Sequence, residues 1–259
     1  MIHSKSSEIS TLVNANIAVL LTGERGSGKT TVCMQVAESL NLKFYSISMT
    51  RQTTLSHLLG FVNVNGTYIP SQLYHAATKG GMFLIDEIDG GDANVLLTLN
   101  TIENGFITFP EGVVELHEDF RLIATANPQD QHEFYVGRNK LDAATLDRFD
   151  IVQIDTDSEL ERSLVDNRTY DEITLMRKLL KEANSSKHVS MRDTIRFYKR
   201  KGLGLAEKFA ERIFGDMPGM IDRYHEQLST LPKYFKQEEC ETVDDLITLL
   251  VSEYDAENQ

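Results

Sequence analysis

The chain has 259 residues, a formal net charge of −13 and 41% hydrophobic residues, which is enough to build one domain with a smaller companion. The acidic balance argues against broad binding to nucleic-acid backbones, and neither a membrane-spanning run nor a secretory signal is present in the sequence. Two distant cysteines, Cys33 and Cys240, indicate a reducing compartment. We therefore expect a cytoplasmic protein that does not insert into membranes.

A phosphate-binding loop is the first strong motif. Residues 23–30 read Gly-Glu-Arg-Gly-Ser-Gly-Lys-Thr, between an apolar run at 17–21 that predicts a strand and a helical pattern at 31–40. Glycines let backbone N–H groups surround a phosphate, Lys29 can reach the β- and γ-phosphates, and Thr30 can offer its hydroxyl to Mg²⁺. The alternative is a glycine-rich turn without a ligand. The residues predicted to bind ATP here are Gly23, Gly26, Ser27, Gly28, Lys29, Thr30 and Thr31.

Two carboxylates close a later strand. Residues 43–49 predict a second strand, and residues 81–88 form a continuous apolar run that ends in Asp86 and Glu87, as a buried parallel strand would. Open α/β sheets bind ligands at the carboxyl ends of their strands, so both side chains are expected beside the phosphate loop. We expect Asp86 to hold Mg²⁺ and Glu87 to orient the attacking water. The alternative is an acidic strand end facing solvent.

A polar amide follows the next strand. Residues 120–126 predict that strand, which stops at Asn127-Pro128 because proline lacks the donor that a sheet requires. Asn127 could then hydrogen-bond both the γ-phosphate and the attacking water. Residues 151–154 predict a fifth strand. Alternating strands and helices predict an α/β domain of three layers with a parallel sheet.

These motifs, in this order, resemble the AAA+ ATPases. The matching segments are Ile-Asp-Glu at 85–87, Ala-Thr-Ala-Asn-Pro at 124–128 and Leu-Asp-Arg-Phe at 146–149. Two predicted hairpins, at 59–73 with an Asn65-Gly66 turn and at 105–119 with a Pro110-Glu111-Gly112 turn, resemble the helix-2-insert clade. That clade includes the MoxR proteins, the cobaltochelatase small subunit and the midasin and dynein-related ATPases. The resemblance implies a P-loop AAA+ core over residues 1–156.

The resemblance also implies roles for single residues. Asn127 matches sensor 1, and Arg148 matches the arginine finger, which projects from one subunit into its neighbour's nucleotide. For Arg148, an ion pair with a nearby aspartate of its own chain is the alternative. Lys29 and Thr30 match the Walker A motif, and Asp86 and Glu87 match Walker B.

Residues 157–231 predict a small helical lid. Apolar residues recur at helical spacing over 158–166, 171–183, 191–201 and 205–214. Ser190-Met191-Arg192 resembles the Ser-Pro-Arg of relatives, with methionine in place of proline, so Arg192 matches sensor 2. A solvated helix arginine is the alternative. Arg25 in the phosphate loop could touch the nucleotide or a neighbouring subunit, and its alternative is a solvated loop charge. Residues 232–259 predict an acidic, amphipathic tail that packs on the lid or a neighbour, or docks a partner.

The client is the least determined part of the function. No basic residue lies between 61 and 70, and the second hairpin is acidic, which favours a protein client over nucleic acid. We expect a Mg²⁺-dependent ATPase that forms a ring, of six subunits, and remodels a protein client. The resemblance implies a partner of the von Willebrand A type. The alternatives are a nucleic-acid motor or loader and a scaffold that binds ATP with negligible turnover, and the hairpins could instead pack between subunits.

Overall fold

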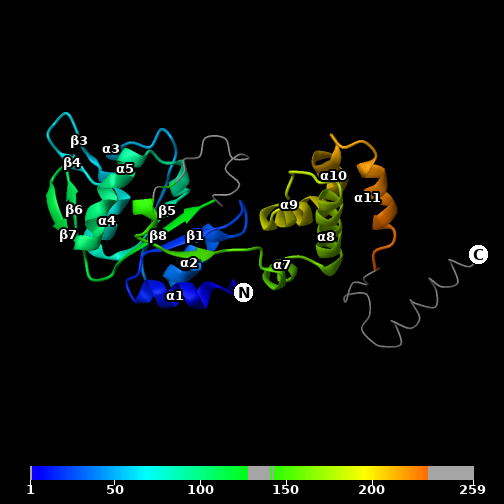
Figure 1. The fold of residues 1–259 in the computed structure, drawn as a ribbon, viewed down its shortest axis with the longest axis horizontal. Helices are drawn as coiled ribbons and strands as arrows, with labels where there is room; N and C mark the ends of the chain where they lie inside the picture. The colour runs from blue at the N-terminus through cyan, green and yellow to red at the C-terminus, as the bar shows by residue number, and fades with distance from the viewer. Residues whose placement is uncertain (1, 128–140, 142, 233–259) are drawn as a thin grey trace, which may run out of the picture. The chain divides into compact units, whose positions relative to one another are not determined.

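The chain forms two compact units. The computed structural model describes residues 2–127, 141 and 143–232. The first unit comprises residues 2–163 together with Ser190–Asp193, and the second comprises residues 164–189 and 194–232 (Figure 1). The domain boundaries expected after residues 156 and 231 remain predictions, and residues 233–259 of the expected tail lie outside the described residues.

The first unit is built on a five-stranded parallel sheet. Its strands run in the order β2-β5-β8-β1-β9. The α/β fold with a parallel sheet is therefore confirmed. Each predicted strand is present, although Glu87 and Ile88 lie beyond the end of their strand, which stops at Asp86. The strands are β1 (Val19–Thr22), β2 (Phe44–Ser48), β5 (Gly81–Asp86), β8 (Phe120–Ala126) and β9 (Asp150–Gln153).

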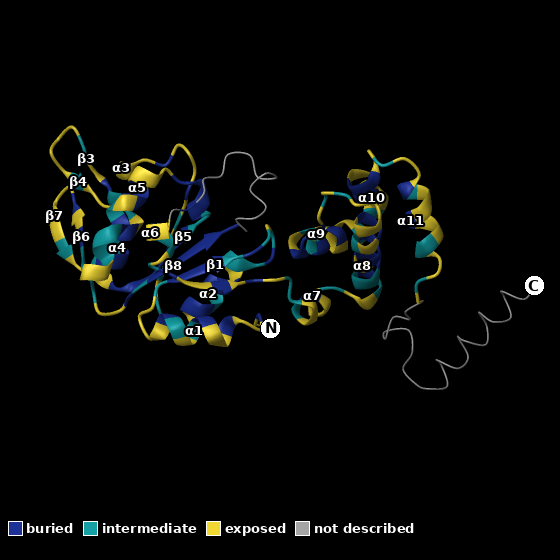
Figure 2. Cartoon of the chain, in the orientation of Figure 1, coloured by how far each residue is buried: buried dark blue, intermediate teal, exposed yellow. Residues whose placement is uncertain are grey.

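Helices cover both faces of this sheet. In β1, Val19 and Leu21 pack with α1 (Ser6–Asn14) and α2 (Lys29–Ser39), while Leu20 points to the opposite face. Figure 2 shows the central strands buried between the two layers of helix. The alternation of side chains along a strand thus supplies two separate cores, and the phosphate loop is fixed between a buried strand and a buried helix.

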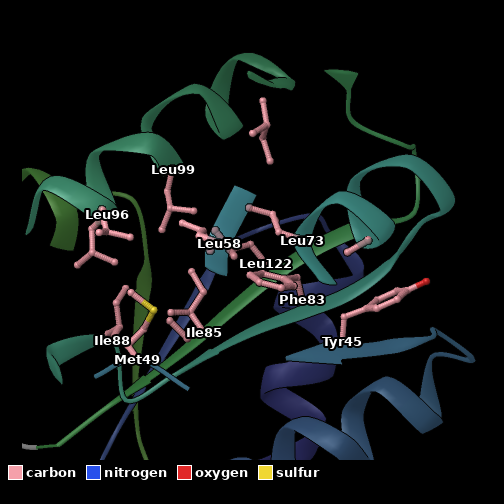
Figure 3. Packing of buried hydrophobic residues seen from close by; sticks show 14 of the residues in the cluster. Tyr45, Met49, Leu58, Leu73, Phe83, Ile85, Ile88, Leu96, Leu99 and Leu122 are labelled. Atoms are coloured by element: carbon pink, nitrogen blue, oxygen red, sulfur yellow. The ribbon is translucent and has the colours of Figure 1, made fainter. Parts of the chain in front are cut away.

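The larger core lies on the face opposite α1 and α2. Phe83 and Ile85 of β5 meet Leu122 of β8 there, under side chains from α4 (Gln72–Lys79) and from the segment after β5 (Figure 3). Each fully buried side chain of this size contributes about 1.5–3 kcal/mol. The remaining short elements of this unit are α3 (Leu55–Leu59), the 3₁₀ helices η1 (Ile88–Gly90) and η2 (Leu97–Asn104), α5 (Ala93–Leu96), α6 (Ala143–Leu146) and α7 (Ser158–Ser163).

The first hairpin forms, but with a different turn from the one predicted. Strands β3 (Phe61–Val62) and β4 (Tyr68–Ile69) pair antiparallel. The N–H of Asn63 bonds to Thr67 O and the N–H of Gly66 to Asn63 O, which leaves a three-residue loop in which Gly66 has φ +77°. The two-residue turn expected at Asn65-Gly66 is therefore wrong. The Asn63 side chain accepts from the backbone N–H groups of residues 65 and 67, which stabilises the longer loop.

Aromatic rings link the second hairpin to the first through α4. Strands β6 (Phe106–Phe109) and β7 (Gly112–Glu115) pair through a two-residue turn, so Gly112 belongs to the strand. Tyr74 of α4 contacts Tyr68 of β4 and Phe109 of β6 edge-to-face, with ring centroids 5.2 and 5.1 Å apart. The two hairpins are thus joined through one helix, whose chain continues into β5.

The second unit is helical. Its core gathers Phe197 of one helix and Phe209 and Phe214 of the next, all fully buried. Sequence periodicity predicted three of the four helices but missed α11. No helix in the described part of the chain is long and apolar enough to cross a membrane. The helices are α8 (Asn167–Glu182), α9 (Met191–Lys201), which begins in the first unit, α10 (Ala206–Phe214) and α11 (Met220–Leu228).

Candidate nucleotide-binding site

The phosphate loop ends in Gly28, at a position where the backbone conformation favours glycine. Gly28 has φ +97° and precedes the first residue of α2, in the left-handed region that glycine enters without strain. The ammonium of Lys29 donates to the carbonyls of Gly23 and Glu24, at 2.6 and 2.9 Å. The loop therefore folds around its own lysine, which brings the cation and the N-terminus of α2 to the same place.

A hydroxyl and a carboxylate meet at the next position. The hydroxyl of Thr30 lies 3.3 and 3.2 Å from the two carboxylate oxygens of Asp86. Oxygen donors of this kind are the ligands that Mg²⁺ prefers, and a magnesium ion bound with ATP takes further oxygens from phosphate and water. The pair therefore fits the metal that sequence analysis assigned to Thr30 and Asp86.

Thr125 of β8 bonds to both acidic residues that follow one another at the end of β5, Asp86 and Glu87. Its hydroxyl donates to Asp86 Oδ1 and accepts from the backbone N–H of Glu87 at 2.9 Å. The Thr125 side chain is fully buried. A single hydroxyl thus orients the proposed metal ligand and fixes the backbone of the proposed water-orienting residue.

The backbone of Glu87 is strained. Its φ of 56° and ψ of 46° lie in the left-handed region, which costs a residue with a side chain about 1–2 kcal/mol. The residue follows the last strand position and precedes η1. This turn directs Glu87 to the carboxyl edge of the sheet instead of continuing the strand, and such strain is often found at functional sites.

Asn127 is held by a buried acid. It is 4% exposed, and its amide nitrogen lies 3.4 Å from the Oδ2 atom of Asp89, which is 1% exposed. The strand β8 ends one residue earlier. Asp89 is therefore in a position to orient the amide that sequence analysis assigned to the γ-phosphate.

These groups surround one cavity of about 120 Å³. Gly23 and Ser27 lie in the loop outside the cavity lining. The lining also includes Arg25, for which the sequence left nucleotide contact open, and Thr125 and Ala126, which sequence analysis did not assign. The sequence-predicted residues that the cavity brings together are Gly26, Gly28, Lys29, Thr30, Thr31, Asp86, Glu87, Asn127 and Arg192.

Arg192 reaches the cavity through a close backbone contact. A Cβ added at Gly26 would lie 2.6 Å from Ser190 Oγ and 3.5 Å from Arg192 Cβ, and Gly26 has φ +81°. Ser190 caps α9, since its hydroxyl lies 2.7 Å from Asp193 Oδ2 and accepts from the Asp193 N–H. With this cap the helix begins at Met191, so the methionine that replaces proline has not removed its start.

Arg148 lies elsewhere in the first unit. Its Nε atom is 3.3 Å from Glu103 Oε1, and it lines a second cavity of about 510 Å³ with residues from η2 and the start of β8. The structure therefore does not bring Arg148 to the nucleotide cavity of its own chain. The intrachain ion pair is the alternative that sequence analysis left open, with glutamate instead of aspartate as the partner.

Sequence reasoning missed Thr125 and Asp89. Thr125 is a polar residue between two buried alanines of β8, and Asp89 follows Glu87 by two residues. A buried polar residue must find a partner, so each position carried a signal. Which groups Thr125 meets depends on the register of β8 against its neighbouring strands, and that register is known only from the fold.

Comparison with known proteins gives the same family. Residues 18–149 match the model of the AAA domain, dynein-related subfamily, which covers about half of the chain. The chain is 29% identical to midasin of Giardia intestinalis over 53% of this chain and 3% of that protein. It is 28% identical to an uncharacterised protein of Staphylococcus saprophyticus over 56% of this chain and 57% of that protein.

The chain thus spans a small part of midasin and somewhat over half of the staphylococcal relative. Among solved structures, NtrX of Brucella abortus covers 87% of this chain and 67% of its own with a TM-score of 0.52 and 13% identity, which shows a shared fold. The family match and the phosphate loop together make this a nucleotide-binding chain. It belongs to the AAA domain family, in the dynein-related subfamily.

Proposed function

We propose that the protein hydrolyses ATP with Mg²⁺ as a ring-forming motor that remodels a protein client. The observation that supports hydrolysis is the single cavity shared by Lys29, Thr30, Asp86, Glu87 and Asn127. If the loop were a glycine-rich turn without a ligand, there would be no reason for the carboxylates after β5 and the amide after β8 to line the same cavity. That convergence favours catalysis over a scaffold that binds nucleotide without turnover.

The chemistry follows from the donors and acceptors that line the cavity. Lys29 exchanges the loop carbonyls for phosphate oxygens, which are stronger acceptors because they are charged. Thr30 and Asp86 would hold a Mg²⁺ ion, which would supply positive charge against the β- and γ-phosphates. Glu87 orients and polarises the attacking water, and Asn127 hydrogen-bonds to the same water and to the γ-phosphate.

In the proposed ring, Arg148 acts at the nucleotide of a neighbouring subunit. An arginine that lines no part of its own nucleotide cavity can serve a neighbouring subunit, where it would stabilise the charge that develops as the γ-phosphoryl group leaves. For this role, the Arg148 guanidinium would have to leave the Glu103 carboxylate and bind a phosphate of the neighbour's nucleotide. We assign six subunits to the ring by analogy with AAA+ relatives.

The first hairpin supports a protein client. Phe61 and Val62 are about half exposed, at 48% and 49%, and Val64 is fully exposed. A nucleic-acid channel would need cations at these positions, and the hairpin has none. Exposed apolar side chains instead suit a polypeptide, alone or presented by a partner of the von Willebrand A type.

The decisive experiment measures ATP turnover over a range of protein concentrations, with molar mass followed by light scattering with and without ATP. A turnover per subunit that rises as the ring forms supports the proposal. Glu87→Gln should retain ATP binding and lose hydrolysis, whereas Lys29→Ala should lose affinity. A constant turnover from a monomer would contradict the ring, and no turnover in any assembled state would favour the scaffold.

A further inference from the structure

A patch with exposed cations and leucines occurs where α9 turns into α10. We call this patch the α9–α10 corner and define it as Lys199, Arg200, Leu203, Leu205 and Lys208. Leu203 and Leu205 are 73% and 38% exposed, and the backbone N–H groups of both donate to Arg200 O, at 3.0 and 2.8 Å. The two leucines are therefore fixed beside the end of α9.

The cationic side chains of the corner differ in their ion pairing from other lysines and arginines of the second unit. Lys201 and Arg168 both bind Glu172 Oε1 at 3.0 Å, and Lys187 is paired with Asp216. Within residues 2–127, 141 and 143–232, by contrast, Lys199, Arg200 and Lys208 form no ion pair. The corner thus combines exposed apolar surface with positive charge that no described acid neutralises.

The described chain ends near Lys201, the last residue of α9, which follows Arg200 of the corner. The Arg168 guanidinium donates to Leu228 O, Leu231 O and Pro232 O, at 3.0 to 3.2 Å. Because Glu172 bridges Arg168 to Lys201, the last residue of α9 lies close to the point where the chain leaves α11. Figure 1 shows α8, which carries Arg168 and Glu172, together with α9 and α11 in this unit.

The chain beyond that point has the complementary composition. Residues 237–259 contain eight acidic residues and no lysine or arginine. Their apolar residues recur at helical spacing, and on a helical wheel Asp244 and Glu253 flank that apolar stripe on its two sides. Residues 233–236 can span roughly 13–14 Å when extended, at about 3.3–3.6 Å per residue, so the acidic segment begins within reach of α9.

We propose that residues 237–259 dock on the α9–α10 corner of their own chain, with the apolar stripe on Leu203 and Leu205 and the flanking acids on Lys199, Arg200 and Lys208. Charge complementarity selects this segment, and the short tether raises its effective concentration at the corner above that of any free partner. The inference does not depend on the proposed ATPase function, because every residue that carries it lies in the second unit or in the acidic segment.

The test uses the full chain with a nitroxide label on Cys240. Cys33 is fully buried, which directs a thiol reagent to Cys240. The amide signals of Leu203, Gly204 and Leu205 should broaden in the labelled protein and recover on reduction of the nitroxide. Lys199→Glu/Arg200→Glu should remove this broadening, and Asp244→Lys/Glu253→Lys should remove it while leaving the corner intact. Combining both pairs of substitutions should restore it.

The matched control is Lys178→Glu/Lys181→Glu, an equal charge change further along α8, which should retain the broadening. Mixing nitroxide-labelled chains with isotope-labelled chains that carry no nitroxide separates docking within a chain from docking between chains. Broadening in that mixture would overturn the proposal, because the segment would then occupy a neighbour's corner. Absence of broadening in the natural sequence, or broadening that survives both charge reversals, would also overturn it.

Discussion

The guanidinium of Arg148 forms an ion pair with the carboxylate of Glu103, with 3.3 Å between Nε and Oε1. Glu103 belongs to η2, the element that leads into the second hairpin. The Glu103 side chain is 58% exposed, and an ion pair exposed to that degree contributes about 0–1 kcal/mol. A phosphate from a neighbouring subunit could therefore replace this carboxylate at little cost in stability.

Removing the arginine should separate binding from hydrolysis. Arg148→Ala should lower ATP turnover by about 10³-fold or more, since arginine fingers supply that much, and leave nucleotide affinity almost unchanged. Mixed rings of Arg148→Ala and Glu87→Gln subunits should regain turnover, because each subunit supplies what its neighbour lacks. Steady-state turnover and nucleotide titration measure the two effects.

Glu103→Gln is the control for this pair. It removes the carboxylate and retains Arg148, so turnover should be equal to or above that of the natural protein. If Arg148→Ala lowers nucleotide affinity and turnover together, or if mixed rings stay inactive, Arg148 has a structural role in its own chain.

Thr125 should act as a positioning residue through its hydroxyl. Thr125→Val keeps the shape of the side chain but removes the bonds to Asp86 and to the Glu87 N–H. Loss of a partner that orients metal ligands typically costs about 10–100-fold in activity or metal affinity. Turnover should fall by that amount and require more Mg²⁺, and Thr125→Ser should restore both. A Ser variant as impaired as the Val variant would show that the side-chain volume, not the hydroxyl, matters.

The sequence predicts the order of strands and motifs because each motif is local. The loop around Lys29 and the acidic end of β5 depend on neighbours in the chain, so nine of the predicted residues meet at one cavity. Strand ends are less predictable: Glu87 leaves the strand because Thr125, far along the chain, holds its N–H. The partner of Arg148 likewise depends on where η2 packs, and the turn of the first hairpin on the Asn63 side chain.

Asp157 should make the free energy of unfolding depend on pH in the acidic range. Hydrogen bonds from the N–H groups of Leu160 and Ser4 lower the pKa of Asp157 to about 2, and Leu160 is the larger cause. The unfolded chain has a pKa near about 4, so this stabilisation is fully present above that pH and is lost as pH falls through about 2. Asp157→Asn should flatten the dependence of the unfolding free energy on pH between those values. Urea denaturation across that range measures it, and parallel curves for the two proteins would refute the assignment.

Glu87 should be a position where glycine stabilises the fold although it removes the catalytic group. In the left-handed region alanine retains the strain and glycine does not, so Glu87→Gly should be more stable than Glu87→Ala by about 1 kcal/mol. Neither variant should hydrolyse ATP. At Lys178, an exposed position inside α8, the order should reverse by a similar amount of about 1 kcal/mol, because glycine weakens a regular helix. Urea denaturation of the four variants tests both orders, and an alanine variant at Glu87 as stable as the glycine variant would mean that this turn relaxes without its side chain.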